Sequence, residues 1–295
     1  MNDVWRRRFD AFRARYLILA WVLLVVYLPG FDWLLNTIPS DAPSYVELLV
    51  GLAWYNLLLI IVIGATLLCY RVPPLRLFGE RASLAAFRHG LLLTLFVFMF
   101  SIVGVYALFY PLALIAPDIV ADWVLTQPDV VIHARGRYPF WPNLLSVLAL
   151  CVVTPVIEEY VFRGMLLHRW ASKWNLRAAV IASSALFGLV HADPIGATAF
   201  ALAMAWLYLR TQSLWVPILC HALNNFAVWL MEVYFVYRDG PLAEYTLDEF
   251  QSDWPWAAWS AVLCLLMVWY AVRRWPQNPA LRLPLDIGPT ARTTF

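Results

Sequence analysis

Six polar side chains lie inside otherwise apolar stretches in the second half of this sequence, and their types suit acid–base chemistry. They are Glu158, Glu159, Arg163, His191, His221 and Asn225. A charged side chain near the middle of a membrane helix costs roughly 2.5–3.5 kcal/mol on insertion scales. One membrane histidine or one Glu–Arg pair is usually structural. Two carboxylates, a guanidinium, two imidazoles and an amide within one region indicate a site instead.

The two glutamates and the arginine occupy two different faces of a predicted helix. Glu159 and Arg163 are four residues apart with the acid on the amino-terminal side, which favours an ion pair. Glu158 points about 100° away from that pair, so its carboxylate remains available for chemistry. Pro155 removes one backbone donor three residues earlier, which weakens the local hydrogen-bond ladder and could admit water. We therefore expect Glu159–Arg163 to brace the site and Glu158 to react.

The histidines and the asparagine come from two further apolar runs. His221 and Asn225 are four residues apart and share one face of a helix. His191 follows a ridge of small residues, which we expect to pack closely against the helix that carries Glu158. The ridge consists of Ser184, Gly188 and Ala192. With a rise of about 1.5 Å per residue, His191 lies nearer the outer face than the other groups, so tilt or an early helix end at Asp193-Pro194 must absorb the difference.

This set of side chains allows a water molecule to cleave an acyl bond. Glu158 and His191 could hold and deprotonate the water, while His221 and Asn225 could donate hydrogen bonds to the developing oxyanion. Serine-triad hydrolysis has less support, because no Ser has a His at usable spacing and both G-x-S-x-G and H-E-x-x-H are absent.

A zinc site built from Glu158, His191 and His221 stays open as an alternative, since three ligands plus water form the usual catalytic zinc arrangement. The metal-free site ranks above it, because Asn225 suits a hydrogen-bond donor better than a metal ligand. We therefore expect no required cofactor.

The elements that must hold these residues are membrane helices. Of the 295 residues, 63% are hydrophobic and only 14% are charged, and the mean hydropathy is +0.69. A soluble domain carries about 45–50% apolar and roughly 25% charged residues, so a single soluble globule is excluded. No stretch alternates with period two, which argues against a barrel. The sequence predicts an all-α polytopic membrane protein.

Eight apolar runs approach or reach the roughly 20 residues that a spanning helix needs. They are residues 16–35, 46–70, 88–115, 143–167, 176–192, 195–210, 214–235 and 256–272. With the amino terminus in the cytoplasm, 17 of the 21 Lys and Arg residues fall on the cytoplasmic side, and the other four lie in outer loops or in a span. This distribution agrees with the positive-inside rule. We predict eight spans in a cell inner membrane with both termini cytoplasmic. The net charge of only +2 gives no support for a nucleic-acid partner.

One membrane domain covers the chain, without internal repeats or a linker between domains. Within it we distinguish three parts by their expected roles. They are an amino-terminal scaffold of three helices and an outer loop over residues 1–142, a catalytic core over 143–235, and an outer loop, last helix and cytoplasmic tail over 236–295. The spans of the first part contain almost no ionisable groups, which predicts plain scaffold there.

Three motifs in this region resemble those of the CPBP family, the intramembrane proteases related to Rce-type CAAX prenyl endopeptidases and to Abi-like proteins. The letters EEYVFR at 158–163 match E-E-x-x-x-R, FGLVH at 187–191 match F-x-x-x-H, and HALNN at 221–225 match H-x-x-x-N. The resemblance covers about residues 140–235. It implies an eight-helix membrane fold with the site inside a helical cavity.

The resemblance also implies roles for the motif residues. Glu158 and His191 would activate the water, His221 and Asn225 would form the oxyanion hole, and the Glu159–Arg163 pair would support the site. The implied protease is of the glutamate type. These roles agree with the ranking reached from the residue types alone.

The substrate is left open by the resemblance, beyond a membrane-bound peptide or protein in a lipid bilayer. Eukaryotic members of the family trim prenylated CAAX tails, whereas bacterial members include bacteriocin-immunity, peptide-processing and sorting-signal (myxosortase-like) proteases. The lead-in Trp141-Pro142-Asn143 points to the sorting subgroup, and 20 Arg against one Lys indicate a bacterium with GC-rich DNA, which disfavours a prenyl substrate. The competing hypothesis is a non-catalytic immunity factor or transporter that uses the same buried polar groups.

Overall fold

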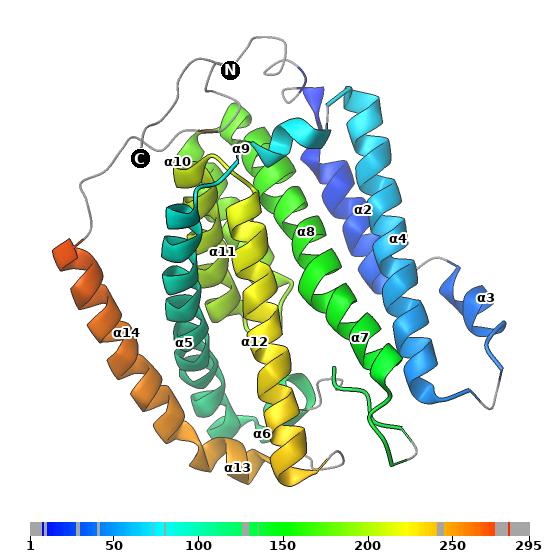
Figure 1. The fold of residues 1–295 in the computed structure, drawn as a ribbon, viewed down its shortest axis with the longest axis vertical. Helices are drawn as coiled ribbons and strands as arrows, with labels where there is room; N and C mark the ends of the chain where they lie inside the picture. Colours follow the sequence, from blue (N-terminus) through cyan, green and yellow to red (C-terminus); the bar gives the residue numbers. More distant parts are fainter. Residues whose placement is uncertain are drawn as a thin grey trace.

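The chain folds into a bundle of helices (Figure 1). The computed structural model describes Arg8, residues 11–27, 30–39, 42–72, 74–79, 81–125, 130–134, 136–240 and 245–274, and Leu283. Its elements are α2 (Ala14–Tyr27), α3 (Phe31–Leu35), α4 (Ser44–Tyr70), η1 (Pro74–Phe78), α5 (Leu84–Ile115), α6 (Pro117–Val120), η2 (Ala121–Leu125), α7 (Phe140–Leu148), η3 (Ala149–Val153), α8 (Thr154–Glu159), η4 (Tyr160–Leu166), α9 (Leu167–Lys173), α10 (Leu176–Leu189), α11 (Pro194–Thr211), α12 (Trp215–Asp239), α13 (Leu247–Ser252) and α14 (Trp254–Arg274). Across these described residues only two isolated β-bridges occur, so the all-α prediction is confirmed.

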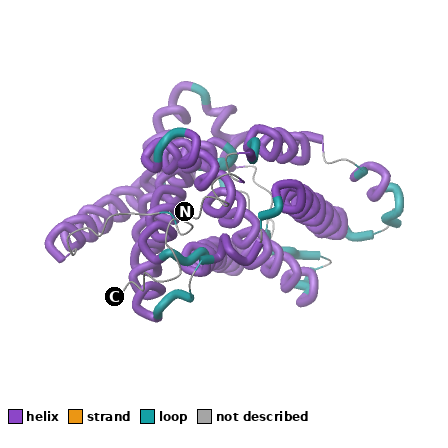
Figure 2. Tube along the Cα trace, turned by 90° about the horizontal axis from the view of Figure 1, so that it is seen from above, coloured by secondary structure: helices purple, strands orange, loops and turns teal. Residues whose placement is uncertain are grey.

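Among the described residues, four helices are long and apolar enough to cross a membrane by length and composition. They cover Tyr45–Tyr70, Leu84–Ile115, Phe140–Lys173 and Trp215–Asp239. Three shorter apolar helices accompany them, over Ala14–Leu24, Leu176–Leu189 and Trp254–Trp269. Together with α11, these helices supply one helix for each of the eight apolar runs predicted from the sequence. Figure 2 shows the bundle from above, with α14 at one edge and α3 at the opposite edge.

The first predicted span, residues 16–35, is wrong as a single helix. The helix α2 ends at Tyr27, and a separate short helix, α3, begins at Phe31. Gly30 between them has φ 78°, in the left-handed region that glycine adopts without a Cβ penalty. The Pro29-Gly30 pair therefore interrupts a run whose composition alone continues to Leu35. The predicted cytoplasmic tail after residue 274 lies, apart from Leu283, outside the described residues.

The helix that carries both glutamates is a composite rod over 140–173 with two π-helical stretches. One stretch, η3, ends at Val153, two residues before Pro155, and the other, η4, directly follows Glu159. A π turn pairs a carbonyl with the N–H five residues later, and proline has no N–H to offer. Short π segments inside α-helices occur often at functional sites. The two stretches therefore flank the turn that presents Glu158 and Glu159.

The small-residue ridge of α10 packs against α11, which corrects the predicted neighbour. A Cβ on Gly188 would lie 1.9 Å from the Thr198 hydroxyl oxygen and 2.6 Å from the Pro194 carbonyl oxygen, both on α11. Ala192, the last residue of the ridge, lies beyond the end of α10 at Leu189. The close approach depends on chain connectivity, because α11 follows α10 after a short turn. Contact with the Glu158 helix is made instead by Phe187, whose ring meets Phe162 at 4.9 Å between centroids.

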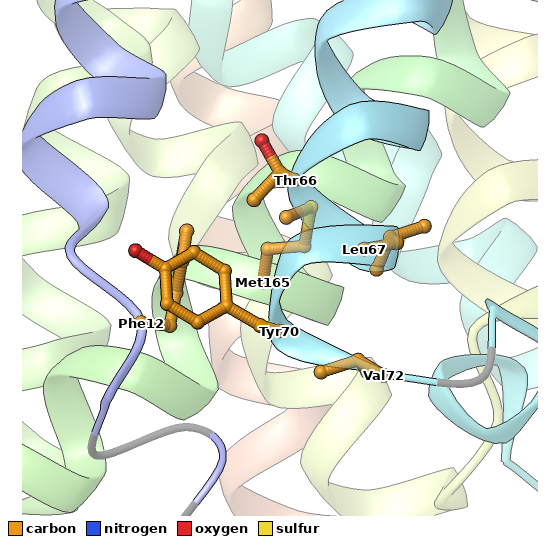
Figure 3. Close-up of a pocket in the computed structure, with 6 residues that line it drawn as sticks. All are labelled: Phe12, Thr66, Leu67, Tyr70, Val72 and Met165. Carbon is orange, nitrogen blue, oxygen red and sulfur yellow. The ribbon is translucent and has the colours of Figure 1, made fainter.

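Two cavities in the described part of the chain lie away from the glutamates. One is a void of about 10 Å³ at the end of α2 and α4, and Figure 3 shows the six side chains around it. They are Phe12, Thr66, Leu67, Tyr70, Val72 and Met165. A void of this size is at the limit for one water molecule, and its apolar lining gives a water few partners. The other is a crevice of about 370 Å³ between α5 and α14, lined by Tyr106, Tyr110 and Trp254 among others.

Candidate active site

The centre of the candidate site is the Glu159 carboxylate, which is completely buried. Its Oε1 accepts a hydrogen bond from Arg163 Nη1 at 3.0 Å, so the predicted ion pair is present. The same oxygen lies 2.9 Å from Nδ1 of His221, which α12 brings from 62 residues away. Arg163 also donates to the Ala201 carbonyl at 3.1 Å, and its guanidinium lies over the Phe187 ring at 4.9 Å. Glu159 therefore connects the arginine to one of the two candidate histidines.

Glu158 faces the other nitrogen of the same imidazole. Its Oε2 lies 3.8 Å from His221 Nε2, which is too long for a direct hydrogen bond. The Glu158 side chain retains 16% of its exposure, whereas the Glu159 side chain retains none. A carboxylate that accepts from Nδ1 places a hydrogen on that nitrogen and directs Nε2 toward Glu158. The two neighbouring glutamates thus have different environments, one enclosed and bonded, the other reachable.

Asn225 is held by a carbonyl that the π-helical turn leaves available. Its Nδ2 donates to the Leu150 carbonyl oxygen at 2.9 Å. Leu150 lies in η3, five residues before Pro155, so the N–H that would complete the π pattern is missing. A carboxamide has two N–H donors, and only one is used in this contact. The predicted weakening of the ladder before Pro155 therefore explains how Asn225 is oriented one turn from His221.

His191 lies in the turn after α10, which ends at Leu189. Its backbone N–H bonds the Gly188 carbonyl, and its Nδ1 lies 2.6 Å from the Phe187 carbonyl oxygen. The imidazole stacks on the Phe187 ring with centroids 4.2 Å apart, and the same ring meets His221 edge-on at 6.0 Å. His191 and Glu158 are both described and are not within ion-pair distance of each other. A water shared between them stays a prediction.

Three residues to which the sequence reasoning gave no role hold the His191 turn in place. Asp193 caps α11 by accepting from the Gly196 N–H at 2.9 Å, and Ser101 of α5 donates to its other carboxylate oxygen. Trp123 donates through its indole nitrogen to the Ala192 carbonyl at 3.2 Å. Asp followed directly by Pro is a helix-start signal that the sequence contains. The hydrogen bond between Asp193 and Ser101 of α5, however, joins residues 92 apart, and the sequence contains no local signal for it.

Glu232, an acidic residue on α12, was also missed. Its Oε1 accepts from the backbone N–H groups of Val130 and Val131, both at 2.7 Å. Asn143 at the start of α7 holds the neighbouring Ile132 through its N–H and its carbonyl, both at 2.8 Å. The segment 130–132 therefore bridges α7 and α12 near Glu232 and Asn143. An acidic residue within an apolar span was the available signal.

The zinc alternative stays a prediction. Within the described residues there is no group of three His, Cys, Asp or Glu side chains that could hold a metal ion, and this includes the trio of Glu158, His191 and His221.

Comparisons with known proteins point to the same part of the chain. Residues 139–227 match a family model described as type II CAAX prenyl endopeptidase Rce1-like. This stretch runs from the start of α7 into α12 and contains all six candidate residues. A Bacillus subtilis (strain 168) protein named "Putative membrane peptidase YdiL" is 36% identical over 92 residues, which make up 30% of this chain and 38% of that protein. No solved structure matches the chain.

Proposed function

We propose that this chain belongs to the CPBP family through the Rce1-like segment at 139–227. We propose further that it is an intramembrane endopeptidase that cleaves a membrane-associated peptide or protein. One observation supports this above the others. A single buried imidazole, His221, lies between two carboxylates, 2.9 Å from the enclosed Glu159 and 3.8 Å from the reachable Glu158. Two acids in such different surroundings suit one supporting and one reacting role.

In the proposed reaction, Glu158 acts as the general base. Its carboxylate takes a proton from a water whose oxygen attacks the carbonyl carbon of the scissile peptide bond. The carbonyl oxygen becomes an oxyanion, and the second N–H of Asn225 and Nε2–H of a protonated His221 donate hydrogen bonds to it. When the C–N bond breaks, the proton held by Glu158 passes to the leaving nitrogen. His191 is the proposed second partner of the water.

Glu159 and Arg163 do not take part in proton transfer in this scheme. Glu159 fixes the orientation of the His221 ring through Nδ1, as the acid does in a Ser-His-Asp triad. Arg163 balances the Glu159 charge in a place where neither side chain is exposed by more than 2%. The proposed site needs no metal, and activity should survive exhaustive dialysis against a chelator. Loss of activity that zinc restores would contradict this part of the scheme.

We further propose that the protein resides in a cell inner membrane with both termini cytoplasmic. The excess of Arg and Lys on the segments that precede α2, α5 and α10 supports this orientation. In a cysteine-accessibility experiment, Arg8 and Tyr245 are replaced by cysteine one at a time. Arg8→Cys should be labelled only from the cytoplasmic side, and Tyr245→Cys only from outside.

The test of function uses the full chain in proteoliposomes. The proteoliposomes are mixed with membranes from host cells that lack the gene for this chain. They are also mixed with a panel of quenched fluorescent peptides, each with an apolar segment of about 20 residues. Wild type should release new peptide termini, read by mass spectrometry, and Glu158→Gln should release none while it melts near the wild-type temperature. Glu47→Gln, an equal change of charge on the exposed start of α4, is the matched control and should cleave normally. Cleavage by Glu158→Gln, or no cleavage by wild type, would count against the proposal.

A further inference from the structure

A tyrosine on the amino-terminal scaffold has a hydroxyl hydrogen without a described acceptor. The indole Nε1 of Trp21 in α2 donates to the Tyr55 hydroxyl oxygen in α4. A phenol oxygen can accept and also donate. Because the oxygen accepts from Trp21, the phenol's own hydrogen points elsewhere, and the described residues offer it no acceptor. A hydroxyl partly removed from water without a partner costs free energy, so this hydrogen is suited to a ligand group.

The contacts of Trp21 place this hydroxyl beside Glu158. The Trp21 ring meets Phe162 edge-on with centroids 5.1 Å apart. Phe162 follows Glu158 by four residues, so the two side chains lie about one turn apart on the same side of the rod. Helix α4 also packs directly against α7 and η3, which belong to that rod. The charge of Glu158 is close enough to act on the Tyr55 phenol.

Tyr55 and His221 come from helices on different sides of the rod that carries Glu158. Figure 1 shows the rod of α7 and α8 running between α4 on one side and α12 on the other. His221 and Asn225 come from α12, whereas Tyr55 comes from α4. Both Glu158 and Tyr55 are incompletely buried. A peptide whose carbonyl carbon lies over Glu158 would therefore have α12 donors on one side and the Tyr55 hydroxyl on the other.

We propose that Tyr55 is a substrate-binding residue whose hydroxyl donates a hydrogen bond to a peptide carbonyl oxygen next to the scissile bond. This inference rests on the proposed function, since it places a peptide beside Glu158. Trp21 is a positioning residue in this arrangement. It occupies a lone pair of the phenol oxygen and so limits the directions that the O–H can take.

The test separates substrate binding from folding and from chemistry. Tyr55→Phe removes only the hydroxyl and should raise KM for the cleaved panel peptides about five- to tenfold, the effect of one hydrogen bond, with kcat nearly unchanged. Trp21→Phe should raise KM less, about two- to threefold, because the phenol remains but is less well oriented. Tyr160→Phe is the matched control, since that hydroxyl donates to the Pro74 carbonyl away from Glu158, and its KM should not change.

A binding measurement keeps the inference testable apart from the proposed function. In the Glu158→Gln background, Tyr55→Phe should weaken binding of a fluorescein-labelled panel peptide by the same factor as the KM change. If Glu158→Gln still cleaves, the proposed function fails. If Glu158→Gln is inactive but Tyr55→Phe leaves both KM and the dissociation constant at their wild-type values, the inference about Tyr55 is overturned while the proposed function stands. A drop in kcat alone, or equal changes in Tyr160→Phe, would also overturn it.

Discussion

Removal of the Glu159 carboxylate tests the central contact of the site most directly. Glu159→Ala leaves the Arg163 guanidinium, only 2% exposed, with a single carbonyl partner, Ala201. It also removes the acceptor of His221 Nδ1 at 2.9 Å. Breaking a buried ion pair by deleting one partner costs about 3–5 kcal/mol, because the remaining charge stays buried. With about 2–4 °C for each kcal/mol in a protein of this size class, we expect the melting temperature to fall by roughly 10 °C.

The assay is thermal unfolding of the purified protein in detergent, followed by tryptophan fluorescence. Glu158→Ala is the matched control, because the neighbouring carboxylate keeps 16% exposure and makes no contact with His221 shorter than 3.8 Å. It should shift the melting temperature by only about 1–2 °C, as expected for a loss well under 1 kcal/mol, and yet abolish cleavage. The two adjacent glutamates should thus separate stability from activity.

A compensating variant sharpens this test. Replacing Arg163 by Met in the Glu159→Gln background removes both charges, and exchange of a whole buried ion pair for apolar or neutral groups is often nearly neutral in stability. The double variant should therefore melt above Glu159→Ala. The reasoning would be refuted if Glu159→Ala melted within about 2 °C of wild type, or if the double variant were less stable than the sum of its single changes.

Three further predictions concern other parts of the structure. Asn225→Ala removes one proposed oxyanion donor and should lower kcat about a hundredfold with little change in KM, read by steady-state kinetics. Gly188→Ala places a Cβ 1.9 Å from a hydroxyl oxygen and 2.6 Å from a backbone oxygen, so it should cost about 1–3 kcal/mol by overpacking and also reduce activity by moving the His191 turn. Hydrogen bonds from the Thr246 N–H and hydroxyl lower the pKa of Glu249, so its contribution to α13 should be complete above its unfolded pKa and lost as the pH falls through the lowered value. Hydrogen exchange of the α13 amides in wild type and Glu249→Gln should then converge at low pH.

Each of these predictions has a control and a refuting result. A rise in KM with kcat unchanged for Asn225→Ala would contradict the assigned oxyanion role, because it indicates lost ground-state binding. Gly64→Ala is the control for Gly188, because a Cβ there would meet nothing within 4 Å, and the two variants must differ in melting temperature. A gap between wild type and Glu249→Gln that widens toward low pH would contradict the assigned direction of the Glu249 pKa.

The amino-acid sequence alone determined the features that depend on backbone periodicity and composition. The Glu159–Arg163 pair follows from the 3.6-residue turn, which puts positions four apart on one face. The weakened ladder before Pro155 follows from the missing N–H, and the structure adds the π-helical turn and the Asn225 contact that result. The helical runs follow from apolar length, except where Gly30 ends the first one early.

The tertiary structure decided which separate helices meet. The bond between Glu159 and His221 joins residues 62 apart, and the sequence contains no local signal for it. The ridge around Gly188 predicts a close approach but not its partner, and the short connection makes that partner α11. The Trp21–Tyr55 bond lies in helices that composition describes as plain scaffold. Periodicity acts over a few residues through one backbone, whereas the choice of neighbour depends on packing between helices that are distant in the chain.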